Sequence, residues 1–213
     1  MGGFTTIKAR IVASFALLVS LFLISAVFNT YIIQRSEDVI ASLYEEKDPS
    51  LTVLNDLKML VSRARELTTN WVYLTKNIED KEELKNILEQ DYPVVREKLN
   101  RLAGNWDTKT ADTLQKAFEV YDMINQGQEE IMHNLATFED YENPLKIFAA
   151  EEKLEFHVLP LSNRLVADLD NIIEEKKREK NLARENLITN NRYIRISIVA
   201  SGLVILTIAI VIS

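Results

Sequence analysis

Cysteine is absent from the 213 residues, and glycine and proline are scarce, with five and four copies. Without cysteine the chain has neither a disulfide framework nor a thiolate metal site. The few glycines form no phosphate-binding loop, and no serine stands in a nucleophile elbow. We therefore predict no enzymatic activity, no catalytic residue and no cofactor within these residues.

Histidine occurs only as His133 and His157. We expect them on neighbouring antiparallel helices, where they could pair, but a metal ion needs more ligands and we predict no metal site. Glu130 precedes His133 with the Glu-x-x-His spacing of di-iron bundles, whereas Leu154 takes the corresponding place before His157. The duplicate motif that such a centre requires is therefore missing.

Charge is missing from two long apolar stretches, residues 11–33 and 196–213. Each is long enough to cross a hydrocarbon core of roughly 30 Å as a helix. For the first stretch a secretory signal peptide is the alternative, but the run exceeds the usual h-region and lacks a clear small-x-small cleavage site, so we expect a retained anchor. No polar flank follows the second stretch, so we expect the chain to be truncated there.

The segment between the spans, residues 34–195, holds 23 basic and 32 acidic residues, a net charge of −9. Such an acidic segment is not expected to bind nucleic acid. Lys8 and Arg10 favour a cytoplasmic N-terminus, residues 1–10, which places residues 34–195 on the extracytoplasmic side of the membrane. Arg192 and Arg195 oppose this orientation, although long loops translocate largely regardless of charge.

Apolar residues repeat at helical spacing through this segment, and turn signals divide it into four helices. The first continues from the membrane helix, kinks at Pro49 and ends in a turn at residues 77–80. The second covers about 24 residues, is interrupted by Pro93 and closes at Gly104. Their predicted inward-facing residues are Leu57, Leu60/Val61, Ala64, Leu67, Trp71, Leu74 and Ile78, and Leu84, Leu88, Asp91/Tyr92, Val95, Leu99 and Leu102.

The third predicted helix has Asp107 or Thr108 as its N-cap and ends in a turn at residues 139–143. Asn143 then caps the fourth helix, with Pro144 in its first turn and a bend at Pro160. The predicted inward-facing residues are Leu114, Phe118, Tyr121, Ile124, Gln128, Ile131, Leu135 and Phe138, and Leu154, Val158, Leu161, Leu165, Leu169 and Ile172.

Helix lengths predict the architecture. The first and fourth helices each run roughly 45–50 residues, while the second and third reach about half to two-thirds as far. Two short helices packed on the distal halves of two long ones make an all-α, antiparallel four-helix bundle, flanked here by two transmembrane helices. Residues 174–192 are too polar to bury much surface, so we expect this stalk to pair with a second chain in a coiled-coil homodimer.

This layout resembles the four-helix-bundle sensor region of bacterial chemoreceptors and related transmembrane sensor kinases. The resemblance covers the whole chain and rests on the short basic N-terminus IKAR, the long-short-short-long helical segment and the two spans. It implies a parallel homodimer in the bacterial cytoplasmic membrane, with a ligand, often a small anion or amino acid, near the distal bundle. It also implies a kinase-control, kinase, phosphatase or cyclase output beyond residue 213.

We therefore expect a signal-transduction receptor whose extracytoplasmic bundle senses an unidentified small-molecule or protein ligand and relays a conformational change through the second span. This expectation rests on analogy with the family. The alternative is a structural or scaffolding membrane protein whose helical domain recruits a partner protein. The sequence after residue 213 would separate the two, because an output module supports signalling and an early stop favours scaffolding.

Candidate ligand-binding residues lie in the first bundle helix, in the stretch LVSRARELTTNWVYL. Arg63 and Arg65 carry the planar guanidinium that grips a carboxylate with two hydrogen bonds. The alternative is that both belong to a solvated face and pair with acids such as Glu66.

Three further candidates, Thr69, Asn70 and Tyr73, surround Trp71. Such β-branched, amide and aromatic residues are unusual in a bundle helix, where alanine and leucine are favoured. In one interpretation they line a pocket. In the other, Trp71 is a large core residue with Tyr73 on its flank.

Overall fold

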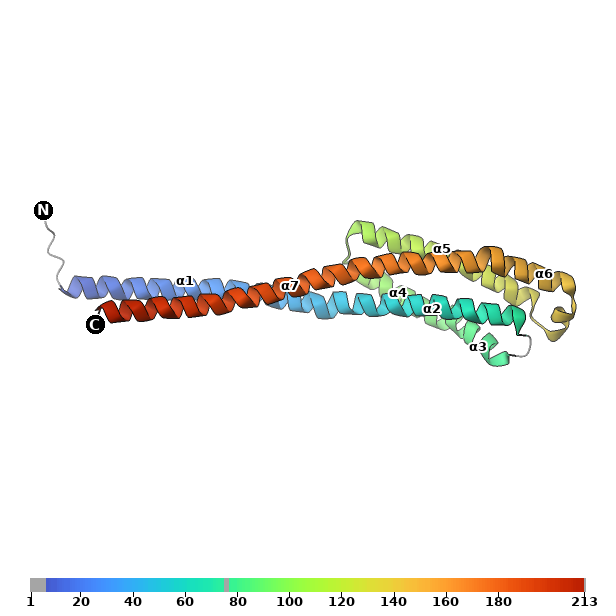
Figure 1. The fold of residues 1–213 in the computed structure, drawn as a ribbon, viewed down its shortest axis with the longest axis horizontal. Coiled ribbons are helices and arrows are strands. Elements are labelled where there is room, and N and C mark those ends of the chain that lie inside the picture. The colour runs from blue at the N-terminus through green and yellow to red at the C-terminus, as the bar shows by residue number, and fades with distance from the viewer. Residues whose placement is uncertain (1–6, 75–76, 213) are drawn as a thin grey trace. The chain divides into compact units, whose positions relative to one another are not determined.

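A computed structural model of the chain describes residues 7–74 and 77–212 (Figure 1). These residues form helices joined by short turns and include no strand, which confirms the predicted all-α class. The chain divides into two compact units. One comprises Met1–Tyr44 and Lys180–Ser213, and the other is Glu45–Glu179, which we call the packed domain.

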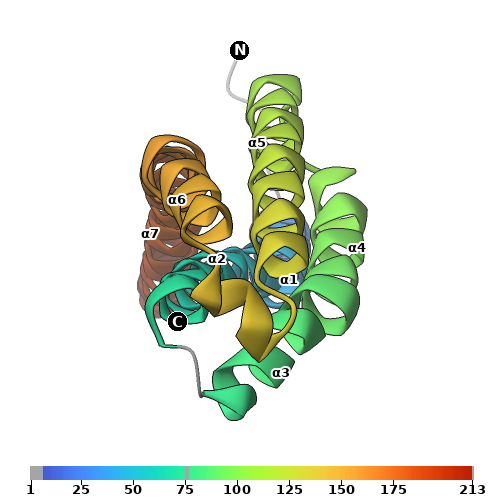
Figure 2. The same cartoon turned by 90° about the vertical axis from the view of Figure 1, so that its right-hand side faces the viewer.

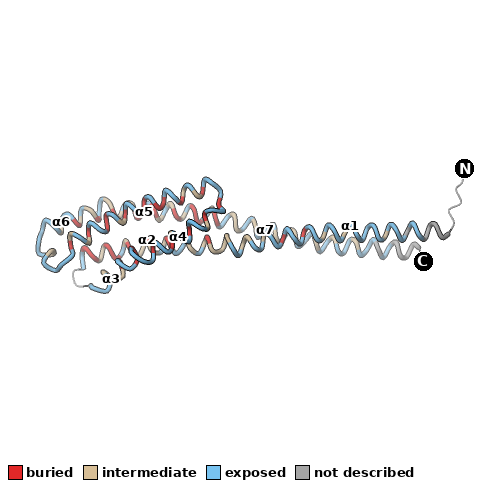
Figure 3. The backbone as a smooth tube through the Cα atoms, turned by 180° about the vertical axis from the view of Figure 1, so that it is seen from behind, coloured by how far each residue is buried: buried red, intermediate tan, exposed pale blue. Residues whose placement is uncertain are grey.

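The first unit contains α1 (Ile7–Ser42) and the C-terminal part of α7 (Leu159–Ile212). The apolar side chains of α1 are mostly exposed, as its pale blue trace in Figure 3 shows. Among the described residues one helix, counted from Phe15 to Tyr73, is long and apolar enough to cross a membrane. An N-terminal signal sequence would have the same features, so the retained anchor stays a prediction. The second predicted span, 196–213, lies partly outside the described residues and also stays a prediction.

The packed domain is built from α2 (Asp48–Tyr73) and from the helices that surround it. They are α3 (Ile78–Asn86), α4 (Tyr92–Ala103), α5 (Thr108–Asn134), α6 (Pro144–Lys153) and the first part of α7. Figure 2 looks along them: α2 packs against α3, α4, α5 and α6, and α5 also packs against α4 and α6. All of these helices contribute to one hydrophobic core.

Most of the predicted inward-facing residues are buried, as the red bands of Figure 3 indicate. The predictions fail at Leu74, Ile78, Asp91 and Phe138, which are exposed. Leu74 and Phe138 lie beyond the ends of α2 and α5, and Ile78 begins α3, so the helical repeat that would turn them inward has already stopped. The sequence left Asp91 and Tyr92 as alternatives for one inward-facing position, and Tyr92 is the buried one.

Three of the four prolines lie inside long helical stretches, and a π-helical turn ends two residues before each one. These pairs are η1 (Leu43–Lys47) with Pro49, η2 (Ile87–Asp91) with Pro93, and η4 (Leu154–Val158) with Pro160. Proline lacks an N–H, and its ring crowds the carbonyl four residues earlier, which lies within the widened turn in all three cases. The predicted kink, interruption and bend therefore take one common form, a widened turn.

Side-chain caps set several helix ends where the sequence predicts them. Asp107 is the N-cap of α5 and accepts from the Thr110 backbone N–H, while Asn143 caps α6 and accepts from Leu145. Asn77 caps α3 by accepting from Asp80. The last predicted turn contains a short 3₁₀ segment, η3 (Phe138–Glu142).

Candidate functional site

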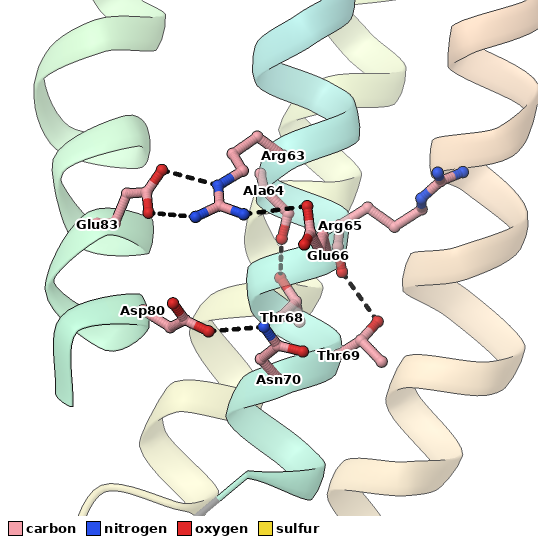
Figure 4. Close-up of polar contacts among 9 residues, drawn as sticks. All are labelled: Arg63, Ala64, Arg65, Glu66, Thr68, Thr69, Asn70, Asp80 and Glu83. Carbon is pink, nitrogen blue, oxygen red and sulfur yellow. Dashed lines mark hydrogen bonds and ion pairs between the residues drawn. The ribbon is translucent and has the colours of Figure 1, made fainter. Parts of the chain in front are cut away.

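Arg63 is engaged by two carboxylates. Its Nε and Nη2 donate to the two oxygens of Glu83 on α3 at 2.8 and 2.6 Å, and its Nη1 lies 3.1 Å from Glu66 (Figure 4). The hydrogen bond from Arg63 lowers the pKa of Glu83, and the bonds to Glu83 and Glu66 raise the pKa of Arg63. The ion-pair interpretation therefore holds for Arg63, whose positive charge is already matched.

Arg65 leaves α2 on the other side, as Figure 4 shows, and its Nη1 donates to Asn163 Oδ1 on α7. No carboxylate in the described part of the chain pairs with it. Both arginines border an open groove over α2 together with Asn55 and Met59. Because the two guanidinium groups diverge, they do not form a single two-arginine clamp.

The other three predicted residues serve separate local contacts. Thr69 Oγ1 donates back to the Arg65 carbonyl at 2.9 Å, and Asn70 Nδ2 donates to Asp80 Oδ2 at 2.6 Å. Tyr73 is half exposed, and its hydroxyl lies 3.4 Å from Glu155 Oε1. Partial burial, followed by the charge of Glu155, raises the pKa of Tyr73. The groove that includes both arginines does not include these three residues.

Trp71 is a core residue, as one of the two interpretations predicts. Its side chain is 3% exposed, and its Nε1 donates to the Leu135 carbonyl at 3.1 Å. The indole thus ties the end of α2 to the end of α5.

Lys81 on α3 belongs to a cluster that the sequence analysis missed. Its ammonium lies 4.9 Å from the centre of the Trp71 ring and 4.6 Å from that of Tyr141 in η3. Nζ donates to the Tyr141 hydroxyl at 2.8 Å, and that hydroxyl donates to the Trp71 carbonyl at 2.5 Å. Lys85, one turn further along α3, lies 5.9 Å from the centre of the Trp71 ring. Two aromatic rings therefore hold the Lys81 ammonium, and one of them, Trp71, also lies near the Lys85 ammonium.

Burial shifts the pKa values of Lys81 and Tyr141. It lowers the pKa of the Lys81 ammonium, and the charge of Lys85 lowers it further. Burial also raises the pKa of Tyr141 to about 12, with a smaller contribution from the charge of Asp140. Both effects disfavour the charged form of each group, since a desolvated charge is less stable than a hydrated one.

The signal available in the sequence for this cluster is the like-charged pair Lys81 and Lys85, four residues apart on one helix face. Such a pair is unfavourable unless something compensates it. Its aromatic partners come from α2 and η3, so only the tertiary structure brings the cluster together.

The two histidines lie on α5 and in η4. Within the described residues no group of three or more His, Asp or Glu side chains is placed to hold a metal ion. His157 instead packs against Gly127 of α5, where an added Cβ would lie 2.9 Å from His157 Cδ2. Gly127 thus lets η4 approach α5 closely.

Searches of protein families, curated proteins and solved structures find no match to this chain.

Proposed function

We propose that the chain is the sensory part of a transmembrane receptor in the bacterial cytoplasmic membrane. In this proposal the packed domain is an extracytoplasmic four-helix bundle that senses a ligand or partner. Its first helix is η1 and α2, its second is α3 to α4, its third is α5, and its fourth is α6 continuing into α7. The bundle passes a conformational change through a second membrane helix within 196–213.

The continuity of α7 is the observation that carries this proposal. The helix runs from Leu159 to Ile212, from the packed domain into the predicted second span. A helix without a loop can transmit sliding or rotation, because no flexible connection absorbs the movement. A ligand shifts such an equilibrium only by binding the two states with different affinity.

Membrane topology is the first test. The chain has no native cysteine, so Glu82→Cys and Lys109→Cys give single reactive positions in the packed domain. A membrane-impermeant thiol reagent should label both in intact cells, because Lys8 and Arg10 favour a cytoplasmic N-terminus. Labelling only after lysis would show that the topology is the reverse, with the packed domain in the cytoplasm.

Relay is the second test, and it separates a receptor from a scaffold. Residues 1–213 fused to the output module of a bacterial sensor kinase should give an output that changes with substitutions in the packed domain. Four glycines inserted after Arg192 should abolish that dependence, because glycine breaks helical continuity. Four alanines inserted at the same place control for length. An output indifferent to every packed-domain substitution would favour scaffolding.

The proposed receptor is a homodimer, paired through its first helix and the stalk of α7. Cysteines scanned through residues 36–56 should form intermolecular disulfides with a helical period. Crosslinking of equal strength at all positions would contradict a packed dimer.

A further inference from the structure

Lys81 and Lys85 differ from most other basic residues of the packed domain in what they contact. Most of the other described basic side chains of this domain meet carboxylates within 4 Å; examples are Lys47, Lys58, Arg63, Arg96, Lys146, Lys153 and Lys176. Lys81 and Lys85 form no ion pair within the part of the chain that the structure describes. Arg65, Lys98, Lys109 and Lys116 also lack an ion pair among the described residues, but of these unpaired cations it is Lys81 and Lys85 that lie over an aromatic ring.

Three acids near the cluster in the sequence are held by other partners. Asp80 and Glu83, on the same helix, bind Asn70 and Arg63. Asp140, next to Tyr141, binds Lys146. These contacts keep three carboxylates occupied beside two ammonium groups.

Lys81 also has unused donors in a fixed place. A lysine ammonium has three N–H donors, and the Tyr141 hydroxyl takes one of them at 2.8 Å. That hydroxyl gives its own proton to the Trp71 carbonyl, so it can act only as an acceptor toward Lys81. The two rings and the hydroxyl therefore fix the ammonium in place before any ligand arrives, which reduces the entropy lost on binding.

We propose that Lys81, held against the rings of Trp71 and Tyr141, and Lys85, one turn along α3, together bind a small oxyanion that carries a carboxylate or a phosphate. The anion bridges the two ammonium groups and accepts the remaining Lys81 donors. It also removes the repulsion between two like charges one turn apart on α3. The biological role of this site rests on the proposed receptor function, because the bound oxyanion would be the signal.

Calorimetric titration of the full chain in detergent micelles tests the site. Sodium acetate, sodium benzoate and sodium phosphate are added at constant ionic strength, with sodium chloride as the reference. We expect saturable binding of at least one oxyanion, and the comparison of acetate, benzoate and phosphate identifies the chemical class. Tryptophan fluorescence should change with the same midpoint, because Lys81 lies over Trp71.

Substitutions locate the binding. Lys85→Met should weaken it at least tenfold, and Lys81→Met should weaken it similarly, since each removes one of the two charges. Lys85 is exposed, so its variant keeps the fold even if Lys81→Met does not. Lys116→Met is the matched control on exposed α5 surface and should bind normally.

Two results would overturn the site: no oxyanion binding above the chloride reference, or unchanged binding in Lys85→Met. If Arg65→Ala abolishes binding and Lys85→Met does not, the oxyanion binds at Arg65 on α2 instead. The relay test in the fusion protein needs no ligand, so it can succeed or fail independently of this titration.

Discussion

The ammonium of Lys176 on α7 lies 4.5 Å from the centre of the Trp106 ring. Both side chains are buried, and Trp106 Nε1 donates to Ser50 Oγ on α2 at 3.1 Å. Glu179 accepts from the same ammonium at 3.0 and 3.1 Å. The turn between α4 and α5 is thereby fastened to the first turn of α2 and to α7, the helix that continues beyond the packed domain.

Lys176→Met and Trp106→Phe should be energetically coupled. A buried cation over an indole contributes roughly 0.5–2 kcal/mol, and phenylalanine is a weaker acceptor of that contact. A double-mutant cycle of urea unfolding, measured by circular dichroism on the chain in micelles, isolates the coupling energy. Lys177→Met is the control, because Lys177 is exposed and pairs with Glu174. Additive effects of the first pair would show that the ring does not stabilise the ammonium.

Trp71→Ala should destabilise the packed domain by about 3–5 kcal/mol, as expected for emptying a large aromatic core site. The same substitution removes the ring beneath Lys81 and the bond to Leu135. Tyr73→Ala, two residues later and half exposed, should cost less than about 1 kcal/mol. Similar losses in the two variants would contradict the burial of Trp71.

Thr68 and Gln128 form a polar pair inside the core, where Gln128 Nε2 donates to Thr68 Oγ1 at 2.7 Å. Thr68→Val keeps the shape but leaves the buried amide without its acceptor, so it should cost about 1–3 kcal/mol. Thr68→Val combined with Gln128→Met should recover much of this loss, because both partners are then apolar. Urea unfolding of the native chain and of these two variants measures the loss and its recovery. A double variant no more stable than Thr68→Val would contradict the role of the bond.

The sequence predicts the helical elements of the packed domain well, because its signals are local. Asp107 and Asn143 cap the helices that they are expected to cap, since an N-cap needs only its own side chain and the next backbone N–H groups. Apolar spacing likewise identifies the core, down to Gln128 as one of the inward-facing residues. Errors occur where a helix stops early, as at Leu74.

The candidate site was much harder to predict. Arg63 pairs with Glu83 on another helix, twenty positions away, whereas Arg65 donates to α7. The closeness of the two arginines in the sequence therefore does not bring their guanidinium groups together. Lys81 depends on Tyr141, sixty positions away. Contacts of this kind are set by tertiary packing, which helical periodicity does not specify.

Asp140 should make the stability of the packed domain depend on acid pH. Its carboxylate accepts from Lys146 at 2.5 Å and from the Thr137 backbone N–H at 2.8 Å, and these bonds lower its pKa from 3.8 to about 2. A lowered folded pKa means that the stabilisation is complete above the unfolded value and is lost as the pH falls through the folded one.

Comparison of the native chain with Asp140→Asn measures this dependence. The difference in unfolding temperature should be largest at about pH 6 and should shrink between about pH 4 and pH 2, because both chains then carry an uncharged side chain at this position. Lys146→Met should reduce the difference already at about pH 6, since Lys146 is the main cause of the lowered pKa. A difference that stays constant down to about pH 2 would mean that folding does not favour the ionised carboxylate of Asp140.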